Sequence, residues 1–216
     1  MARRLNGAAG LFKVGSQLFT AEGPRAVERL AGLARGIFLD LKFHDIPNTV
    51  ERAVAAAAEL PKVRLLTLHA SGGLAMMQAA RKALAGKTNR PALLAVTILT
   101  SLDARALRRV GIRGSPGSRA IELARLAQEA GLDGVVASGH EVRPIRRACG
   151  KKFLIVVPGV RPASAFVDDQ ARVATPIEAL EAGADYLVIG RPITAAPDPR
   201  GAAIAIVKEI AAARKN

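Results

Sequence analysis

Two stretches decide the fold: Glu129-Ala-Gly-Leu-Asp-Gly-Val-Val136 and Glu181-Ala-Gly-Ala-Asp-Tyr-Leu-Val188. In each, a helical segment ends at a glycine, and an aspartate and a short apolar run follow. Glycine is typical of the residue just after a helix, and a short apolar run after such a signal is typical of a buried strand. Repeated helix–strand units of this kind build parallel sheets, either as a (β/α)8 barrel or as a doubly wound sheet.

Further apolar runs of this type occur along the chain, with helical patterns between them. They are nearly continuous in apolar residues, as strands buried on both faces are. We predict seven strands, one fewer than a (β/α)8 barrel needs, at Leu11–Val14, Ile37–Leu41, Leu65–Leu68, Leu93–Leu99, Gly134–Ala137, Leu154–Val157 and Tyr186–Ile189. Among the helices, one is expected to begin at Pro24, one at the capping box Thr175-Pro-Ile-Glu178, and a last one at Asp198-Pro199.

Composition limits the class of protein. The chain has 216 residues, 50% of them hydrophobic, which suits one compact domain. Cys149 is the only cysteine, so no intrachain disulfide is possible and a reducing compartment is expected. No apolar run approaches the roughly 20 residues that span a bilayer. We therefore expect a soluble, cytoplasmic protein that does not enter a membrane.

The net charge of +14 favours an anionic partner, or else reflects a basic surface without specific use. The basic residues are spread along the chain and do not form a recognised DNA-binding motif. Aromatic residues make up only 3%, so stacking platforms for single-stranded nucleic acid are scarce. We expect no dedicated nucleic-acid binding.

The densest group of polar residues is Asp40-Leu-Lys42-Phe-His-Asp45, at the end of a predicted strand. Parallel α/β folds place function at the carboxyl ends of their strands. Asp40 and Lys42 are two apart, so in a strand they point to the same side. A buried ion pair is costly to desolvate, which favours a functional role, but a purely structural pair remains an alternative.

A second group of polar residues follows the last two predicted strands. Arg161 comes after one of them, and Gly190-Arg191 after the other. In (β/α)8 barrels these loops often bind phosphate, glycine allows close approach of an anion, and arginine offers a fork of donors. The residues thus predict a phosphorylated small substrate beside a lysine–aspartate cluster, unless Gly190-Arg191 is an ordinary surface turn.

The stretch Phe38-Leu-Asp-Leu-Lys-Phe-His-Asp-Ile-Pro-Asn-Thr49 resembles the signature of bacterial orotidine 5′-monophosphate decarboxylases. The resemblance covers nearly the whole chain from about residue 5. Other matching stretches include Leu11-Phe-Lys-Val-Gly15, Leu68-His-Ala-Ser-Gly-Gly73, Pro158-Gly-Val-Arg-Pro162 and Gly183-Ala-Asp-Tyr-Leu-Val-Ile-Gly-Arg-Pro-Ile-Thr194. It implies a TIM barrel of one domain over residues 1–216 and decarboxylation of orotidine 5′-monophosphate to UMP, a step of pyrimidine biosynthesis.

The resemblance also implies a role for each matching residue. Lys42 is similar to the family's proton donor to C6, Asp40 would lie beside the substrate carboxylate, and Lys13 would contact the ribose. Asp45 and Thr49 would reach the neighbouring site across a homodimer. Thr100 would contact the pyrimidine, and the phosphate would be gripped by Arg161, Gln170, Gly190 and Arg191, with the segment from Arg161 to Gln170 closing over the ligand. No cofactor and no metal ion are expected, and the sequence has no Cys/His spacing typical of a metal site.

The resemblance fails at the N-terminus. Family members begin with a strand ending in Leu-Asp and a helix, whereas here Ala2–Ala9 is similar only to the tail of that helix. We expect a barrel short of one strand and part of a helix, with exposed strand edges, lower stability and much reduced activity. A start codon assigned too late, a truncation and a variant fold are the explanations we considered.

Two other functions were considered. A sugar-phosphate decarboxylase or aldolase of the same superfamily shares the Asp-x-Lys-x-x-Asp pattern but usually needs magnesium. A catalytically impaired form would only bind nucleotide. Ile46-Pro-Asn-Thr49 and Gln170 favour the nucleotide decarboxylase over the sugar-phosphate enzyme.

Overall fold

The computed structural model describes residues 1–161 and 174–213. Its strands form one parallel sheet in which each strand pairs with the next along the chain. In order, the strands are β1 (Phe12–Gly15), β2 (Ile37–Phe43), β3 (Val63–His69), β4 (Ala92–Val96), β5 (Gly134–Val136), β6 (Leu154–Pro158) and β7 (Tyr186–Val188). This is the strand order of a TIM barrel with seven strands, as predicted.

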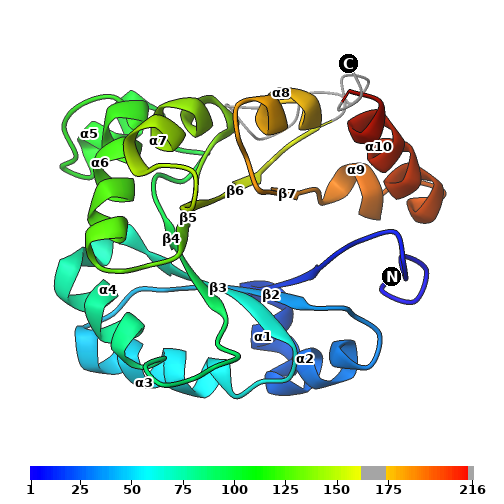
Figure 1. Cartoon of the computed structure of the whole chain (residues 1–216), viewed down its shortest axis with the longest axis horizontal. Coiled ribbons are helices and arrows are strands. Elements are labelled where there is room, and N and C mark those ends of the chain that lie inside the picture. Colours follow the sequence, from blue (N-terminus) through cyan, green and yellow to red (C-terminus); the bar gives the residue numbers. More distant parts are fainter. Residues whose placement is uncertain (162–173, 214–216) are drawn as a thin grey trace.

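The helices lie outside the curved sheet, and the strands run through the middle of the molecule (Figure 1). They are α1 (Ser16–Glu22), α2 (Pro24–Ala31), α3 (Pro47–Ala58), α4 (Gly73–Lys82), α5 (Ala104–Arg109), α6 (Pro116–Glu129), α7 (Val142–Cys149), α8 (Pro176–Glu181), α9 (Arg191–Thr194) and α10 (Pro199–Ala213). Two short 3-10 turns follow β3 and β5, at Ala70–Gly72 and Gly139–Glu141. Among the described residues, no helix is long and apolar enough to cross a membrane.

Side chains alternate between two buried layers along each strand. The outer layer, between sheet and helices, contains Leu39, Leu66 and Leu93. The inner layer consists of residues from neighbouring strands that pack on one another inside the barrel: Phe38, Leu65, Leu94, Val96, Val136 and Val156. Because the alternation continues along β2 and β3, Asp40 and Thr67 fall on the inner side, above this apolar layer.

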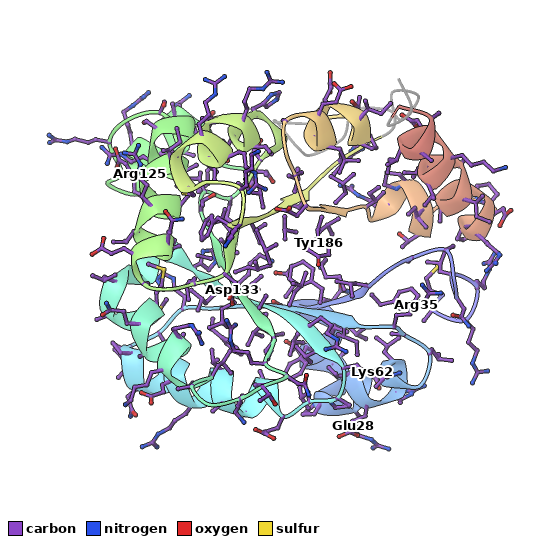
Figure 2. All side chains as sticks on the ribbon, in the orientation of Figure 1. Glu28, Arg35, Lys62, Arg125, Asp133 and Tyr186 are labelled. Atoms are coloured by element: carbon purple, nitrogen blue, oxygen red, sulfur yellow. The ribbon has the colours of Figure 1, made fainter. Side chains whose placement is uncertain are left out.

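The two ends of the sheet are β1 and β7. In the described part of the chain no strand pairing joins them. Tyr186, on β7 (labelled in Figure 2), is 40% exposed, whereas all three residues of β5 are buried. The exposed edge expected from the sequence is therefore present, and an unpaired edge of this kind leaves backbone groups available for pairing.

The N-terminal residues lie beside α9 and α10 (Figure 1). Arg200 of α10 donates through Nη1 to the backbone oxygen of Asn6 at 2.7 Å. Residues 2–8, expected to resemble the tail of a helix, form consecutive turns, with a hydrogen bond from Leu5 N to Met1 O. Gly7 has a φ of +79°, a left-handed conformation that is common where helical turns end.

The predicted strands are confirmed to within about two residues at most ends, with one correction. Strand β4 ends at Val96, not at Leu99. Thr97 still donates through its backbone N to the oxygen of Val136, but the chain then leaves the ladder in a turn. The predicted helix starts at Pro24, at the Thr175 capping box and at Pro199 are confirmed.

Candidate active site

A cavity of about 190 Å³ opens at the carboxyl ends of the strands. Six strands, all but β3, supply side chains to its wall, and turns after the strands supply the rest. It is lined by Lys13, Phe38, Asp40, Lys42, Val96, Ile98, Leu99, Thr100, Val136, Ala137, Pro158 and Val188. Three charged side chains thus face a wall that is otherwise largely apolar, the composition typical of a small-molecule site.

The charged side chains form one cluster around Asp40. Lys42 donates through Nζ to Asp40 Oδ2 at 2.7 Å, and Lys13 Nζ lies 3.3 Å from the same oxygen. The other carboxylate oxygen, Oδ1, accepts from the hydroxyl of Thr67 at 3.0 Å. The ion pair predicted between Asp40 and Lys42 is therefore present, and Lys13 from the neighbouring strand joins it.

The electrostatics keep Asp40 ionised. Burial alone would raise the pKa of Asp40, a residue that is only 7% exposed. The hydrogen bond and charge of Lys42, the charge of Lys13 and the hydrogen bond from Thr67 outweigh that effect, so the pKa of Asp40 lies below its ordinary value. A carboxylate with two ammonium groups thus stands at the cavity wall near neutral pH.

The backbone at Lys42 departs from regular strand geometry. Leu39 pairs with Leu66 and Phe43 pairs with Leu68, so three residues of β2 face the single residue Thr67 of β3. Lys42 lies within this bulge and has a φ of +52°, a left-handed conformation that is uncommon for any residue except glycine. Strain of this kind is often found at functional sites, and it re-aims the side chain that carries it.

Asp45 and Thr49 are not brought to the cavity of their own chain. Both are exposed: Asp45 lies just before α3, and Thr49 lies in the first turn of that helix. Asp45 accepts from the backbone N of Ile46 at 2.7 Å, and no contact with Lys13, Asp40 or Lys42 is seen among the described residues. Ile46, between them, is 66% exposed, so this segment presents apolar and acidic groups outward together.

Three of the residues predicted to bind phosphate follow directly after strands that end at the rim of the cavity. Pro158 and Val188 end β6 and β7 and line the wall, and Arg161 and Gly190 follow them by a few residues. Arg161 donates through its backbone N to the oxygen of Ala174, and Arg191 begins α9. A side chain at Gly190 would meet no atom within 4 Å, so the backbone there is open to approach. Gln170 lies outside the described residues.

Thr67 is the residue of this cluster that the sequence analysis missed. It is completely buried and contacts both Asp40 and the backbone of Lys42. The signal was present, since a hydroxyl interrupts the apolar run Leu65-Leu66-Thr67-Leu68. Threonine is common in strands, however, so the sequence alone does not distinguish this position.

No group of three or more His, Cys, Asp or Glu side chains with the geometry of a metal site occurs in residues 1–161 and 174–213. The charges of Asp40 and Lys42 act on His69, whose ring centre lies 5.4 Å from that of His44. Burial, and next the charges of His44 and Lys42, lower the pKa of His69 below its ordinary value. The groups that face Asp40 are therefore two lysines, one threonine and a histidine that is neutral near pH 7.

Comparison with known proteins identifies the relatives of this chain. Residues 1–206 match the model of the orotidine 5′-phosphate decarboxylase / HUMPS family. The orotidine 5′-phosphate decarboxylase of Nitrosococcus oceani is 56% identical over 210 residues, which cover 97% of this chain and 90% of that one. The enzyme of the same name from Moorella thermoacetica is 57% identical over 213 residues, covering 96% and 84%.

Solved structures are similar as well. The crystal structure of orotidine 5′-phosphate decarboxylase from Lactobacillus acidophilus superposes with a TM-score of 0.79 at 41% identity, covering 92% of this chain and 85% of that one. An uncharacterized conserved protein from Geobacillus kaustophilus gives a TM-score of 0.81 at 39% identity, covering 96% and 93%. The likeness thus extends over nearly the whole chain in both sequence and fold.

Proposed function

The chain belongs to the orotidine 5′-phosphate decarboxylase / HUMPS family, and on that premise we propose how its cavity carries out the decarboxylation of orotidine 5′-phosphate to UMP. The observation that carries the proposal is the pair of ammonium groups, Lys42 Nζ and Lys13 Nζ, held on one oxygen of Asp40 at the cavity wall. The reaction needs a fixed cation and a proton at one carbon atom, and this cluster supplies both.

Lys42 is the proposed proton donor. When the bond between C6 and the carboxyl group breaks, CO2 leaves and its bonding electron pair remains on C6. The ammonium of Lys42 stabilises that charge and then transfers a proton to C6, which leaves UMP and a neutral amine that water protonates again. Preorganised charge of this kind is usually the largest single contribution to catalysis.

Asp40 and Lys13 complete the cluster. Asp40 lies beside the substrate carboxylate and fixes both ammonium groups, and Lys13 contacts the ribose. Since the carboxylate of Asp40 is ionised and bonded on both oxygens, Lys42 is held ready before substrate binds. Reorganisation that is completed in the free enzyme costs nothing during the reaction.

The phosphate and the base are bound at the rim. Arg161, Gln170, Gly190 and Arg191 grip the phosphate, and Thr100, in the cavity wall, contacts the pyrimidine. Binding energy from the phosphate, far from C6, is converted into orientation of the base against Lys42. The positions of Arg161 and Gly190 just after β6 and β7 support this assignment.

The active form proposed is a homodimer. Asp45 and Thr49 reach the cavity of the partner subunit, because in their own chain both are exposed, Asp45 just before α3 and Thr49 in its first turn. The exposed Ile46 between them supports an interface at this place. No cofactor and no metal ion take part in the proposed reaction.

Turnover of orotidine 5′-phosphate by the purified chain tests the function. We expect UMP to form, chelator to have no effect, and Lys42→Ala to lose activity by several orders of magnitude. Arg147→Ala, at an exposed position on α7, serves as the matched loss of one positive charge. Full activity of Lys42→Ala would refute its role as proton donor.

Mixing two inactive variants tests the shared site. Lys42→Ala and Asp45→Ala each remove a catalytic residue from both cavities of a homodimer. In a mixed dimer, the cavity of the Asp45→Ala subunit retains its own Lys42 and receives the intact Asp45 of the other subunit. We expect activity to return to about a quarter of the wild-type value on statistical mixing of subunits. Failure to recover, with subunit exchange shown independently by labelled chains, would place Asp45 in its own subunit's site or outside the reaction.

A further inference from the structure

The bulge in β2 creates a backbone donor that the sheet cannot satisfy. Between the pairs Leu39–Leu66 and Phe43–Leu68, β2 has two more residues than β3, so the regular ladder is interrupted at Lys42. A buried backbone N–H without a partner costs about 1–3 kcal/mol. At Lys42, the hydroxyl of Thr67 takes the place of the missing backbone acceptor, at 3.0 Å.

The same hydroxyl also has a donor role. It donates to Asp40 Oδ1 at 3.0 Å, on the side of the carboxylate away from Lys42 Nζ. One oxygen atom thus fixes the backbone of Lys42 and the carboxylate that holds the Lys42 ammonium. The side chain and the main chain of Lys42 are tied to a single buried point on the neighbouring strand.

We propose that Thr67 is a positioning residue, whose hydroxyl holds the left-handed backbone of Lys42 and the carboxylate of Asp40 in the arrangement needed for proton delivery. Thr67 lies on the inner side of β3, below the Asp40 carboxylate, and does not line the cavity. It acts through Lys42 and Asp40 and does not contact substrate. The inference rests on the proposed role of Lys42.

The consequence for catalysis follows from the geometry. Lys42 has a φ of +52°, which a free lysine residue avoids, so the surrounding contacts must hold it. Without the Thr67 hydroxyl, the residue is free to relax toward an extended conformation, and its Nζ moves with it. A displacement of about 1 Å in a catalytic group lowers the rate roughly a hundredfold.

The test replaces the hydroxyl by a methyl group of the same shape. We expect Thr67→Val to lower kcat about tenfold to a hundredfold, with KM within about threefold of the wild-type value. The acid limb of the kcat profile should also move to higher pH, because one hydrogen bond that lowers the pKa of Asp40 is lost. Thr67→Ser keeps the hydroxyl and should restore both kcat and the acid limb.

The other groups that face Asp40 are Lys13 from β1, Lys42 from its own strand, and His69 from β3. They are the same in the wild type and in Thr67→Val, which differ only in a hydroxyl replaced by a methyl group, so this comparison isolates the hydroxyl. Thr97→Val is the matched control. Thr97 is 4% exposed, lies directly after the end of β4, and donates through its hydroxyl to the backbone oxygen of Val136 and not to Asp40.

The possible outcomes distinguish the positioning role of Thr67 from the proposed function of the chain. A wild-type chain that turns over, with a Thr67→Val variant that loses stability like Thr97→Val but keeps its kcat and its acid limb, would overturn the positioning role. So would a Thr67→Ser variant as slow as Thr67→Val. If Thr67→Val does not fold, the pair Thr67→Ser and Thr67→Ala, which differ only in the hydroxyl, carries the same comparison. Loss of all turnover in the wild type would instead count against the proposed function.

Discussion

Asp133 and Asp185 occupy equivalent positions in the barrel, Asp133 directly before β5 and Asp185 directly before β7. Each precedes a strand and accepts through Oδ2 from a backbone N of the strand before it, Leu93 for Asp133 and Ile155 for Asp185, both at 2.8 Å. Each also pairs with an arginine, Arg90 or Arg146 (Asp133 is labelled in Figure 2). The aspartate of each Gly-x-Asp repeat therefore links the starts of two neighbouring strands by a hydrogen bond, at the end of the barrel away from the cavity.

Loss of Asp133 should reduce stability without reducing catalysis. In Asp133→Ala, the backbone N of Leu93 and the two donors of Arg90 lose their acceptor. We expect the free energy of unfolding to fall by about 1–3 kcal/mol, measured by urea denaturation, with kcat unchanged. Glu59→Ala, which breaks the exposed pair with Lys87, should cost less than about 1 kcal/mol. Equal losses in the two variants would contradict the structural role.

The charge of Asp40 should stabilise the fold only above acidic pH. Its pKa in the folded chain lies below the ordinary value near 3.8, so the folded state binds its proton less readily than the unfolded chain does. The stabilisation is therefore complete above the unfolded pKa and is lost as the pH falls through the folded pKa.

The measurement is urea unfolding of the wild type and Asp40→Asn at several pH values. We expect the wild type to be more stable at pH 6, and the difference to shrink as the pH falls below about 4. A difference that stays constant down to pH 3 would show that the charge of Asp40 is not what stabilises the wild type.

Gly134 should not tolerate a side chain. A Cβ built there would lie 2.2 Å from the backbone oxygen of Leu154 on the adjacent strand β6, so the sheet would have to move. We expect Gly134→Ala to destabilise the fold by about 1–3 kcal/mol or more. Gly117→Ala, in α6, meets no atom within 4 Å and should stabilise by about 0.4–1 kcal/mol. Thermal melting of the two variants checks both, and a Gly134→Ala variant that melts like the wild type would contradict the close approach.

Arg191 should matter for substrate affinity through the shape of its guanidinium group. Arg191→Lys keeps the charge but loses the two-donor fork that fits phosphate. Because a charge-assisted hydrogen bond contributes about 1.5–3 kcal/mol, we expect kcat/KM to fall roughly tenfold to a hundredfold, mainly through a higher KM. Arg147→Lys, on the exposed side of α7, should leave both constants unchanged. An unaltered KM in Arg191→Lys would remove Arg191 from the phosphate site.

Much of the fold follows from local patterns in the sequence. Runs of apolar residues predict the strands, and the residue types at Thr175 and Pro24 predict the capping box of α8 and the start of α2. The pairing of Asp40 with Lys42 was also predicted, since the two residues are close along the chain. These features depend on a few consecutive residues, whose conformational preferences act in any context.

Other features of the site depend on which strands lie side by side. The sequence by itself determined the parallel α/β architecture, the end of β2 as the place of the charge cluster, and a sheet of seven strands with an exposed edge. Only the tertiary structure decided the left-handed backbone of Lys42, the two bonds of Thr67 to the cluster, and the outward direction of Asp45 and Thr49. The reason is that a bulge is set by the register between two strands, and a hydroxyl 25 residues away along the chain finds its partners only when that register is formed.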